Sequence, residues 1–168
     1  MSLSDYQTVA VTGASSGIGA AVAHALSRRG LKVHAIACRE DRLAQQTGCV
    51  IHALDIRETE ALVALLGSLK VDVLVNNAGV GRGFGSLADA DPIDIDCTLD
   101  TNVRAAVHAV RAVLPSMIER GTGPYCQRRV HGRTLPVVLG CVRCFEGCSP
   151  RAINGSAVGI AGHGYPGH

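Results

Sequence analysis

The feature that most constrains the fold of this chain is a strict alternation of strand-like and helix-like segments along residues 7–120. Short apolar runs rich in β-branched residues predict buried strands at 8–12, 32–37, 50–54 and 71–75. Apolar residues at helical spacing predict helices at 17–29, 39–46, 58–69 and 96–120. Parallel neighbouring strands need a crossover between them, and such crossovers are right-handed. The alternation therefore predicts an α/β fold with a doubly wound parallel sheet.

Two of the predicted helices have a defined apolar face. The helix at 58–69 presents the leucines Leu62, Leu65, Leu66 and Leu69. The long helix at 96–120 is amphipathic, with its apolar positions at Leu99, Val103, Ala106, Val107, Val110 and Leu114. We expect both faces to pack in the core of the domain.

The size and charge of the chain exclude several classes of protein. Its 168 residues predict one domain, and 47% apolar with 18% charged residues suffices for a core. A net charge of +2 without a dense Lys/Arg stripe argues against nucleic acid as a partner. No apolar run approaches the roughly 18 residues of a membrane span, and the N-terminal sequence lacks the layout of a signal peptide. We therefore expect a cytoplasmic protein without membrane association, whose seven cysteines are thiols.

The first predicted strand runs into a glycine-rich segment, Thr12-Gly13-Ala14-Ser15-Ser16-Gly17-Ile18-Gly19. A phosphate at a helix N-terminus meets unpaired N–H groups and the positive end of the helix dipole. Glycines at such a turn let the backbone approach a pyrophosphate closely. Alone, the segment is also compatible with an ordinary tight turn. Its place after a strand, at the start of a helix and within the first βαβ unit favours a dinucleotide-binding site.

Four motifs, in this order, resemble the short-chain dehydrogenase/reductase family. They are Gly13-x-x-x-Gly17-x-Gly19, Asp55 after the third strand, Asn76-Asn77-Ala78-Gly79 after the fourth, and Asp100-Thr101-Asn102-Val103 on the long helix. The resemblance extends over residues 5–123 and implies a Rossmann-like domain. It also implies an NAD(P)-dependent oxidoreductase that moves a hydride between nicotinamide and a small-molecule carbonyl or alcohol.

The resemblance implies a role for each matching residue. The pyrophosphate and the adjoining ribose would be bound by Gly13, Ser15, Ser16, Gly17, Ile18 and Gly19. Asp55 would accept a hydrogen bond from the adenine amino group, with Ile56 beside it, although an aspartate here also fits a helix N-cap. The adenosine side would be lined, and the sheet braced, by Asn77, Ala78 and Gly79. Asn102 would be the catalytic asparagine that holds a water for proton transfer; taken alone, it fits a structural polar residue.

The end of the second strand bears on the choice of nucleotide. NAD-specific sites usually place an acid there to bind the ribose 2′-hydroxyl, whereas this chain has Ala37-Cys38-Arg39. Arg39 can pair with a 2′-phosphate, and the acids Glu40 and Asp41 follow one turn too late. The sequence favours NADP over NAD as cofactor. The alternative for Arg39 is a solvated side chain in the first turn of a helix.

The chain changes character after Gly123. Of its fourteen acidic residues only Glu146 lies beyond this point, and the helical and strand periodicities stop. We therefore divide the chain into a dinucleotide-binding domain, 1–123, and an irregular tail, 124–168, that does not resemble the family.

The resemblance requires a fifth strand that ends in a catalytic Ser, followed by a Tyr-x-x-x-Lys helix. The Lys would lower the pKa of the Tyr, the general acid/base. The only tyrosines are Tyr6, Tyr125 and Tyr165, and none has a lysine four residues on. This chain is therefore expected to be catalytically incomplete.

Three interpretations of the tail are open. Cys141-x-x-Cys144, with Cys126, Cys148 and histidines, would form a metal site, but no second pair has matching spacing, so we expect no metal. The tail would otherwise be a genuine alternative C-terminus or the product of a reading-frame shift.

The genetic code allows the third interpretation to be examined. The codons that can encode residues 125–131 were shifted by one base, with CGN used for Arg. The shifted frame can encode Ile-Val-Asn-Val-Gly-Ser-Met, which resembles the family's fifth strand and the Ser at its end. Further on, the codon that straddles Val142 and Arg143 allows Tyr. The codon that straddles Glu146 and Gly147 encodes Lys or Arg. We therefore favour one extra base near the codons of Gly123 and Pro124.

Two functions therefore remain open for this chain. It derives from an NAD(P)-dependent oxidoreductase of the family, or it is a non-catalytic nucleotide-binding or interaction module with a genuine variant C-terminus. The family is usually homo-oligomeric. Without a fifth strand, the strand at 71–75 would be an edge of the sheet, and its apolar run would favour self-association of the chain.

Overall fold

The computed structural model describes residues 6–82, 86–120, 124–127 and 142–143. A central sheet has the strand order β3-β2-β1-β4-β5-β6. Its strands are β1 (Thr8–Thr12), β2 (Lys32–Ala37), β3 (Cys49–Ala53), β4 (Val73–Asn76), β5 (Pro124–Gln127) and β6 (Val142–Arg143). The helices are α1 (Gly17–Ser27), α2 (Glu40–Leu43), α3 (Thr59–Ser68), the 3₁₀ turn η2 (Leu87–Asp89), α4 (Pro92–Leu99), the π-helix η3 (Asp100–Arg104) and α5 (Ala105–Glu119).

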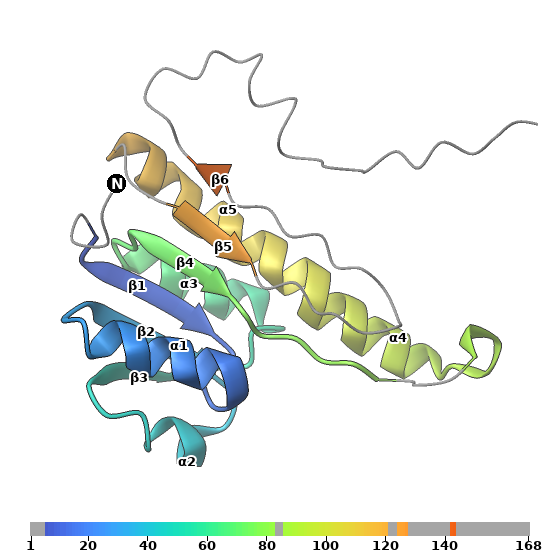
Figure 1. Ribbon diagram of the computed structural model, residues 1–168. Coiled ribbons are helices and arrows are strands. Elements are labelled where there is room, and N and C mark those ends of the chain that lie inside the picture. The colour runs from blue at the N-terminus through green and yellow to red at the C-terminus, as the bar shows by residue number, and fades with distance from the viewer. Residues whose placement is uncertain (1–5, 83–85, 121–123, 128–141, 144–168) are drawn as a thin grey trace, which may run out of the picture.

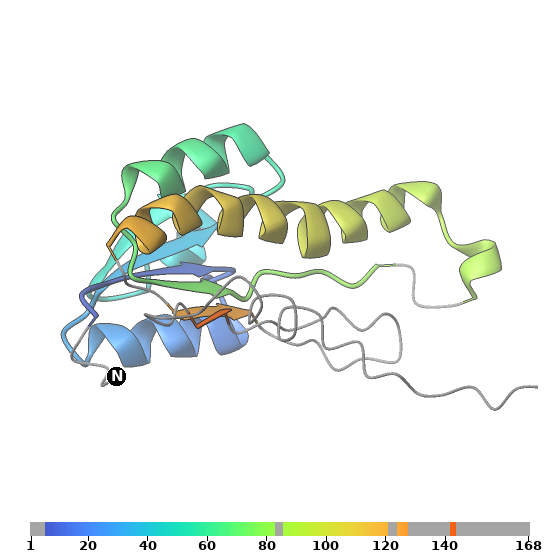
Figure 2. The ribbon, with the colours of Figure 1, turned by 90° about the horizontal axis from the view of Figure 1, so that it is seen from above.

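The sheet is doubly wound, as the alternation of elements predicted. All pairs formed among β1 to β5 are parallel, and the pair of β5 with β6 is antiparallel. Helix α1 lies on one face, and α3 and α5 lie on the other (Figures 1 and 2). The chain runs outward from β1 to β3 and returns to place β4 on the other side of β1. The carboxyl ends of β1 and β4 thus form the switch point at which such sheets bind their ligands.

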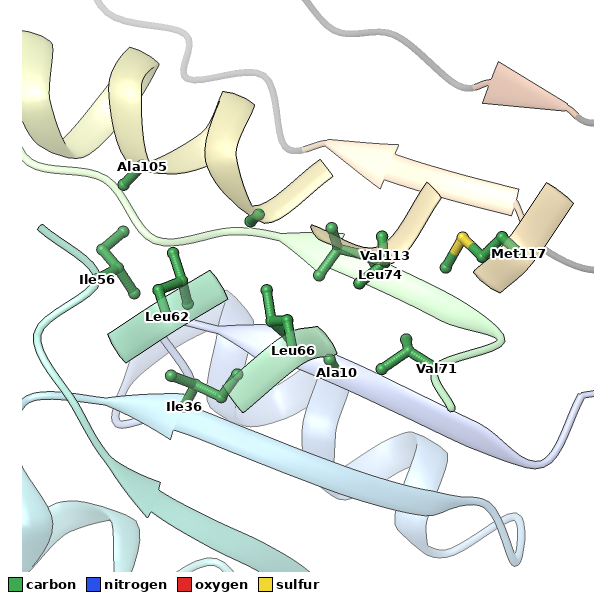
Figure 3. Close-up of a cluster of buried hydrophobic side chains, with 11 residues drawn as sticks. Ala10, Ile36, Ile56, Leu62, Leu66, Val71, Leu74, Ala105, Val113 and Met117 are labelled. Atoms are coloured by element: carbon green, nitrogen blue, oxygen red, sulfur yellow. The ribbon is translucent and has the colours of Figure 1, made fainter. Parts of the chain in front are cut away.

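Each face of the sheet buries its own apolar cluster. On the face covered by α3 and α5, Leu62 and Leu66 of α3 and Met117 of α5 belong to one buried cluster that also contains Ile36 and Leu74 of the strands (Figure 3). Leu65 and Leu69 are partly buried against the same cluster, so the leucine face predicted for α3 is confirmed. The opposite cluster joins α1 and α2 to the other side of β1 and β2, through residues that include Val9, Val11, Ala23, Val33 and Leu43.

The prediction for the long helix was wrong in its start and was confirmed only in part for its buried face. The helix begins at Pro92, where Asp91 caps it by accepting a hydrogen bond from the Ile93 N–H at 2.8 Å. Of the predicted apolar positions, Leu99, Val103 and Val107 are exposed. The buried residues are mostly small, and two predicted positions are among the packed ones, since Ala106 is buried and Val110 packs against the core cluster. The others are Thr101, Ala105, Ala109, Val113 and Met117. Small side chains allow the helix backbone to lie close to the sheet, and the Asn76 side chain donates to the Ala106 carbonyl at 3.1 Å.

Strand β4 is not an edge of the described sheet. Its residues Leu74, Val75 and Asn76 pair in parallel with Tyr125, Cys126 and Gln127 of β5. The expectation that the strand at 71–75 lacks an outer neighbour is therefore corrected, and with it the reason given for self-association. The pairing of the backbone begins one residue after Gly123, where the helical and apolar patterns of the sequence had ended.

Candidate functional site

The turn between β1 and α1 is closely packed against the loop that follows β4. Gly13 has φ +68°, and its N–H donates to the Ile36 carbonyl at 2.8 Å. A Cβ at Gly13 would lie 2.7 Å from the Ala78 Cα, and a Cβ at Gly19 would collide with the Asn77 amide nitrogen and the Gly13 oxygen. Glycine is therefore required at positions 13 and 19 by contacts within the protein itself.

Gly17, by contrast, faces open space. Its φ is +58°, which favours glycine, but a Cβ there would meet no atom within 4 Å. It opens helix α1, whose N-cap residue Ser16 makes no side-chain hydrogen bond to the helix. The first turn continues with Ile18, which is 55% exposed. The positive end of α1 is thus accessible beside an empty volume, an arrangement suited to an anion.

Arg39 extends from the end of β2 over the glycine-rich turn. Its guanidinium donates to the Ser16 hydroxyl at 2.8 Å and to the Ser15 hydroxyl at 3.1 Å. Ser15 is buried, whereas Ser16 and Arg39 are exposed. A guanidinium and two hydroxyl groups therefore converge beside the N-terminus of α1, and each can donate a hydrogen bond to a phosphate oxygen.

Asn77 and Thr12 join the ends of β1 and β4. The Asn77 side chain donates to the Thr12 and Gly13 carbonyls at 3.1 and 3.2 Å. The Thr12 hydroxyl accepts from the N–H groups of Asn77 and Ala78, both at 3.1 Å, and its side chain is buried. Thr12 was not among the predicted site residues. Its hydroxyl, at the last residue of an otherwise apolar strand, was the signal available in the sequence.

Asp55 and Ile56 follow β3. Ile56 is 7% exposed and belongs to the apolar cluster under α3, so only its backbone is available to a ligand. Asp55 accepts hydrogen bonds from the backbone N–H and the guanidinium of Arg57. These bonds hold the pKa of the Asp55 carboxyl below its usual range, although partial burial acts in the opposite direction.

Asn102 lies in the π-helix between α4 and α5. Its side-chain oxygen accepts from the Val80 N–H at 2.8 Å, and its side-chain nitrogen donates to the Val80 carbonyl at 2.7 Å. Val80 directly follows Gly79, so the long helix is fastened to the loop after β4. Both polar groups of the side chain are used in this contact, and π-helical turns often occur at functional sites.

Among the described residues, the structure therefore brings three predicted groups together at the carboxyl ends of β1, β2 and β4. These are the glycine-rich turn, Arg39, and the Asn77–Gly79 loop. Asp55 stands at the end of the neighbouring strand β3, and Asn102 joins the loop through Val80. Asn76, which ties β4 to α5, was part of a quoted motif but had no predicted role.

The described ranges also contain cysteines and other side chains of the kinds that bind metal ions. Three cysteines there, Cys38, Cys49 and Cys97, are free thiols, and no cluster of three or more His, Cys, Asp or Glu side chains is arranged to hold a metal ion. The pair Cys141 and Cys144 lies outside the described residues. No helix in the described part has the length and apolar character needed to cross a membrane.

Comparison with known proteins gives the same class of domain. The family profile described as short chain dehydrogenase matches residues 7–124. An uncharacterized short-chain type dehydrogenase/reductase of Sinorhizobium fredii is 39% identical over 148 residues, which cover 79% of this chain and 60% of the relative. The NADP-dependent 3-hydroxy acid dehydrogenase YdfG of Escherichia coli is 34% identical over 152 residues, covering 77% of this chain and 61% of that protein.

Solved structures agree in fold. Serine dehydrogenase from Escherichia coli matches with a TM-score of 0.67 and 34% identity, covering 72% of this chain and 61% of that one. A metagenomic short-chain oxidoreductase in complex with NADP matches with a TM-score of 0.66 and 33% identity, covering 72% of this chain and 60% of that one. Fold and site define a Rossmann-like α/β domain with a glycine-rich turn at its switch point. The chain belongs to the short-chain dehydrogenase/reductase family, and it spans about 60% of the length of the curated relatives it matches.

Proposed function

We propose that this chain binds NADP at the carboxyl ends of β1, β2 and β4, as the nucleotide-binding part of an oxidoreductase. The observation that carries the proposal is Arg39, whose guanidinium lies over Ser15 and Ser16 beside the accessible start of α1. A 2′-phosphate there would receive charge-assisted hydrogen bonds. Relatives support the same nucleotide, because YdfG is NADP-dependent and the metagenomic oxidoreductase was solved with NADP.

The remaining roles follow from the geometry. The pyrophosphate would lie over Gly17, in the open space beside Ser16 and Ile18 and above the turn shaped by Gly13 and Gly19. Asp55 would accept from the adenine amino group, with the backbone of Ile56 beside it. Asn77, Ala78 and Gly79 would form the wall of the adenosine side.

The nicotinamide ring, when bound, supplies or accepts the hydride. Asn102 would act through its backbone, since its side chain is already bound to Val80, and would hold a water on the path by which protons leave. In the whole family-type enzyme we infer a small-molecule carbonyl or alcohol as substrate and a cytoplasmic location.

Nucleotide binding is tested by calorimetric titration of the full chain with NADP⁺ and NAD⁺. We expect tighter binding of NADP⁺, and Arg39→Ala should weaken it by about tenfold or more while leaving NAD⁺ little changed. Arg42→Ala removes an exposed arginine of the same short helix α2 and is the matched control. Equal affinity of the unmodified chain for both nucleotides would refute the NADP preference, and no binding of either would refute the site.

We further propose that the chain as it stands does not turn over substrate, because it lacks the Tyr-x-x-x-Lys pair that would supply the general acid/base. A reading-frame shift near Gly123 accounts for this loss. In support, the family profile ends at residue 124. The alternative candidate is a nucleotide-binding module with a genuine C-terminus, favoured by the parallel pairing of β5 with β4.

The nucleotide sequence across the codons of residues 122–147 separates these two candidates. A frame shift requires that removal of one base near Gly123 give Tyr across Val142/Arg143 and Lys across Glu146/Gly147. The repaired chain should then oxidise NADPH in the presence of a panel of aldehydes and ketones, whereas the present chain should not. A stop codon within the shifted frame would establish the genuine-tail alternative.

A further inference from the structure

The turn that follows β3 contains an ion pair between Arg57 and Asp55. It is exposed to solvent, yet several hydrogen bonds fix the two side chains relative to each other. The Arg57 Nε donates to Oδ1 and Oδ2 of Asp55 at 3.1 and 3.0 Å, and the Arg57 backbone N–H donates to Oδ1 at 3.0 Å. A second guanidinium nitrogen also donates to Oδ2. One side chain therefore fixes both the plane and the charge of the carboxylate.

A third contact fixes the guanidinium from the other side. The Arg57 Nη1 lies 3.6 Å from the Cys97 sulfur on α4, so the arginine spans from the turn after β3 to the long helical segment. The Arg57 and Asp55 side chains are 47% and 24% exposed. An ion pair this accessible contributes little to the free energy of unfolding. Its ordered geometry is better explained by a need for a correctly oriented carboxylate.

We propose that Arg57 is a positioning residue that presents the Asp55 carboxylate, ionised and in a fixed plane, to the amino group of the adenine ring. This inference rests on the proposed NADP site. Three N–H groups of Arg57 share the four lone-pair directions of the carboxylate, because the single Nε N–H is divided between the two oxygens, so one direction remains for an adenine N–H. Arg57 thereby acts on adenine recognition through Asp55, without touching the nucleotide phosphates.

The charged and titratable groups around Asp55 make this role testable by pH. They are Arg57 on its own turn and Cys38 at the end of β2. Arg57 lowers the pKa of Asp55, whereas burial raises it. Without the guanidinium, the carboxyl would take up a proton at a higher pH. A protonated carboxyl offers the adenine amino group a weaker acceptor.

The experiment compares NADP⁺ with its hypoxanthine analogue, in which the adenine amino group is replaced by oxygen. The unmodified full chain should prefer the adenine form by about tenfold, because the oxygen of the analogue cannot donate to Asp55 and places two acceptors against each other. Arg57→Gln should reduce this preference to about threefold or less, and should shift the acid limb of NADP⁺ binding to higher pH. Arg57→Lys should restore part of the adenine preference and move the acid limb of NADP⁺ binding part of the way back.

The controls separate this inference from the proposed function. Arg104→Gln removes an exposed Arg–Asp pair of comparable accessibility and should leave the base preference unchanged. If the unmodified chain binds NADP⁺ with the adenine preference and Arg57→Gln retains both the preference and the pH profile, the inference is wrong and the nucleotide site stands. If the unmodified chain binds both bases equally, Asp55 does not read the amino group and the inference fails. If it binds neither nucleotide, the proposed function fails and the inference with it.

Discussion

His34 Nδ1 lies 2.8 Å from His52 Nε2, across the neighbouring strands β2 and β3. The rings are stacked, with centroids 5.1 Å apart and an interplanar angle of 21°. His34 is 3% exposed, and burial lowers the pKa of both rings; the neighbouring charges of His52 and then Lys32 lower the pKa of His34 further. One ring donates and the other accepts, so the hydrogen bond is lost when both rings are protonated and neither offers an acceptor.

The pair predicts that acid destabilises the protein. Because the folded-state pKa values lie below the unfolded value near 6.5, the stability is fully present above that pH and falls as the pH decreases below it. We expect the free energy of unfolding to decrease steadily as the pH is lowered below 6.5. Urea unfolding between pH 7.5 and 5.5 measures it. His52→Gln should flatten the dependence, whereas His24→Gln, an exposed position on α1, should not; an unchanged slope in His52→Gln would contradict the prediction.

Gly19→Ala should destabilise the domain by about 2 kcal/mol or more, because the new methyl group collides with Asn77 and Gly13. Thermal unfolding followed by circular dichroism measures the change. Gly67→Ala is the matched control, since a Cβ in that helical position meets no atom within 4 Å. It should raise the stability by about 0.5–1 kcal/mol through helix propensity. Equal effects of the two substitutions would disprove the packing argument.

Thr12→Val should cost about 1–3 kcal/mol, because the buried N–H groups of Asn77 and Ala78 lose their common acceptor while the side-chain volume is kept. Thr12→Ser keeps the hydroxyl and should recover most of the loss. Chemical denaturation of the two variants provides the comparison. Thr12→Val with the stability of the unmodified chain would show that the hydroxyl is dispensable.

Asn102→Ala should release the loop after β4 from the long helix. The Val80 N–H loses its side-chain acceptor, so its hydrogen exchange should accelerate by about tenfold or more. The N–H groups of Val9 and Val11 in β1 serve as internal references, because they lie in the sheet core. Exchange at Val80 that stays slow would mean that another contact holds the loop.

The sequence predicted the parallel sheet because each element carried a local signal: β-branched runs for β1 to β4, leucines at helical spacing for α3, and glycines at the turn into α1. For the long helix it succeeded only in part, because Ala106 and Val110 pack as predicted whereas the large side chains Leu99, Val103 and Val107 are exposed. The small Ala105 and Ala109 are buried instead, because closeness to the sheet selects size as much as hydropathy.

The site divided in the same way. Its glycines follow recognisable spacing, and they lie together in the structure. Three other contacts depend on how separate segments are placed relative to one another. They are the hydrogen bonds of Asn102 with Val80, of Arg39 with Ser15 and Ser16, and of Arg57 with Asp55. Such contacts leave no periodic signal in a single sequence, so they could not be predicted before the three-dimensional structure was known.

The fit of Gly13 and Gly19 against Asn77 and Ala78 limits how this domain can be recombined. The two loops belong to different strands, and Gly13 and Asn77 are 64 residues apart in the chain. A chimaera that takes one loop from this protein and the other from a relative would join surfaces shaped by different neighbours. Exchange between homologues should therefore yield a folded hybrid only when residues 12–19 and 76–80 are inherited together.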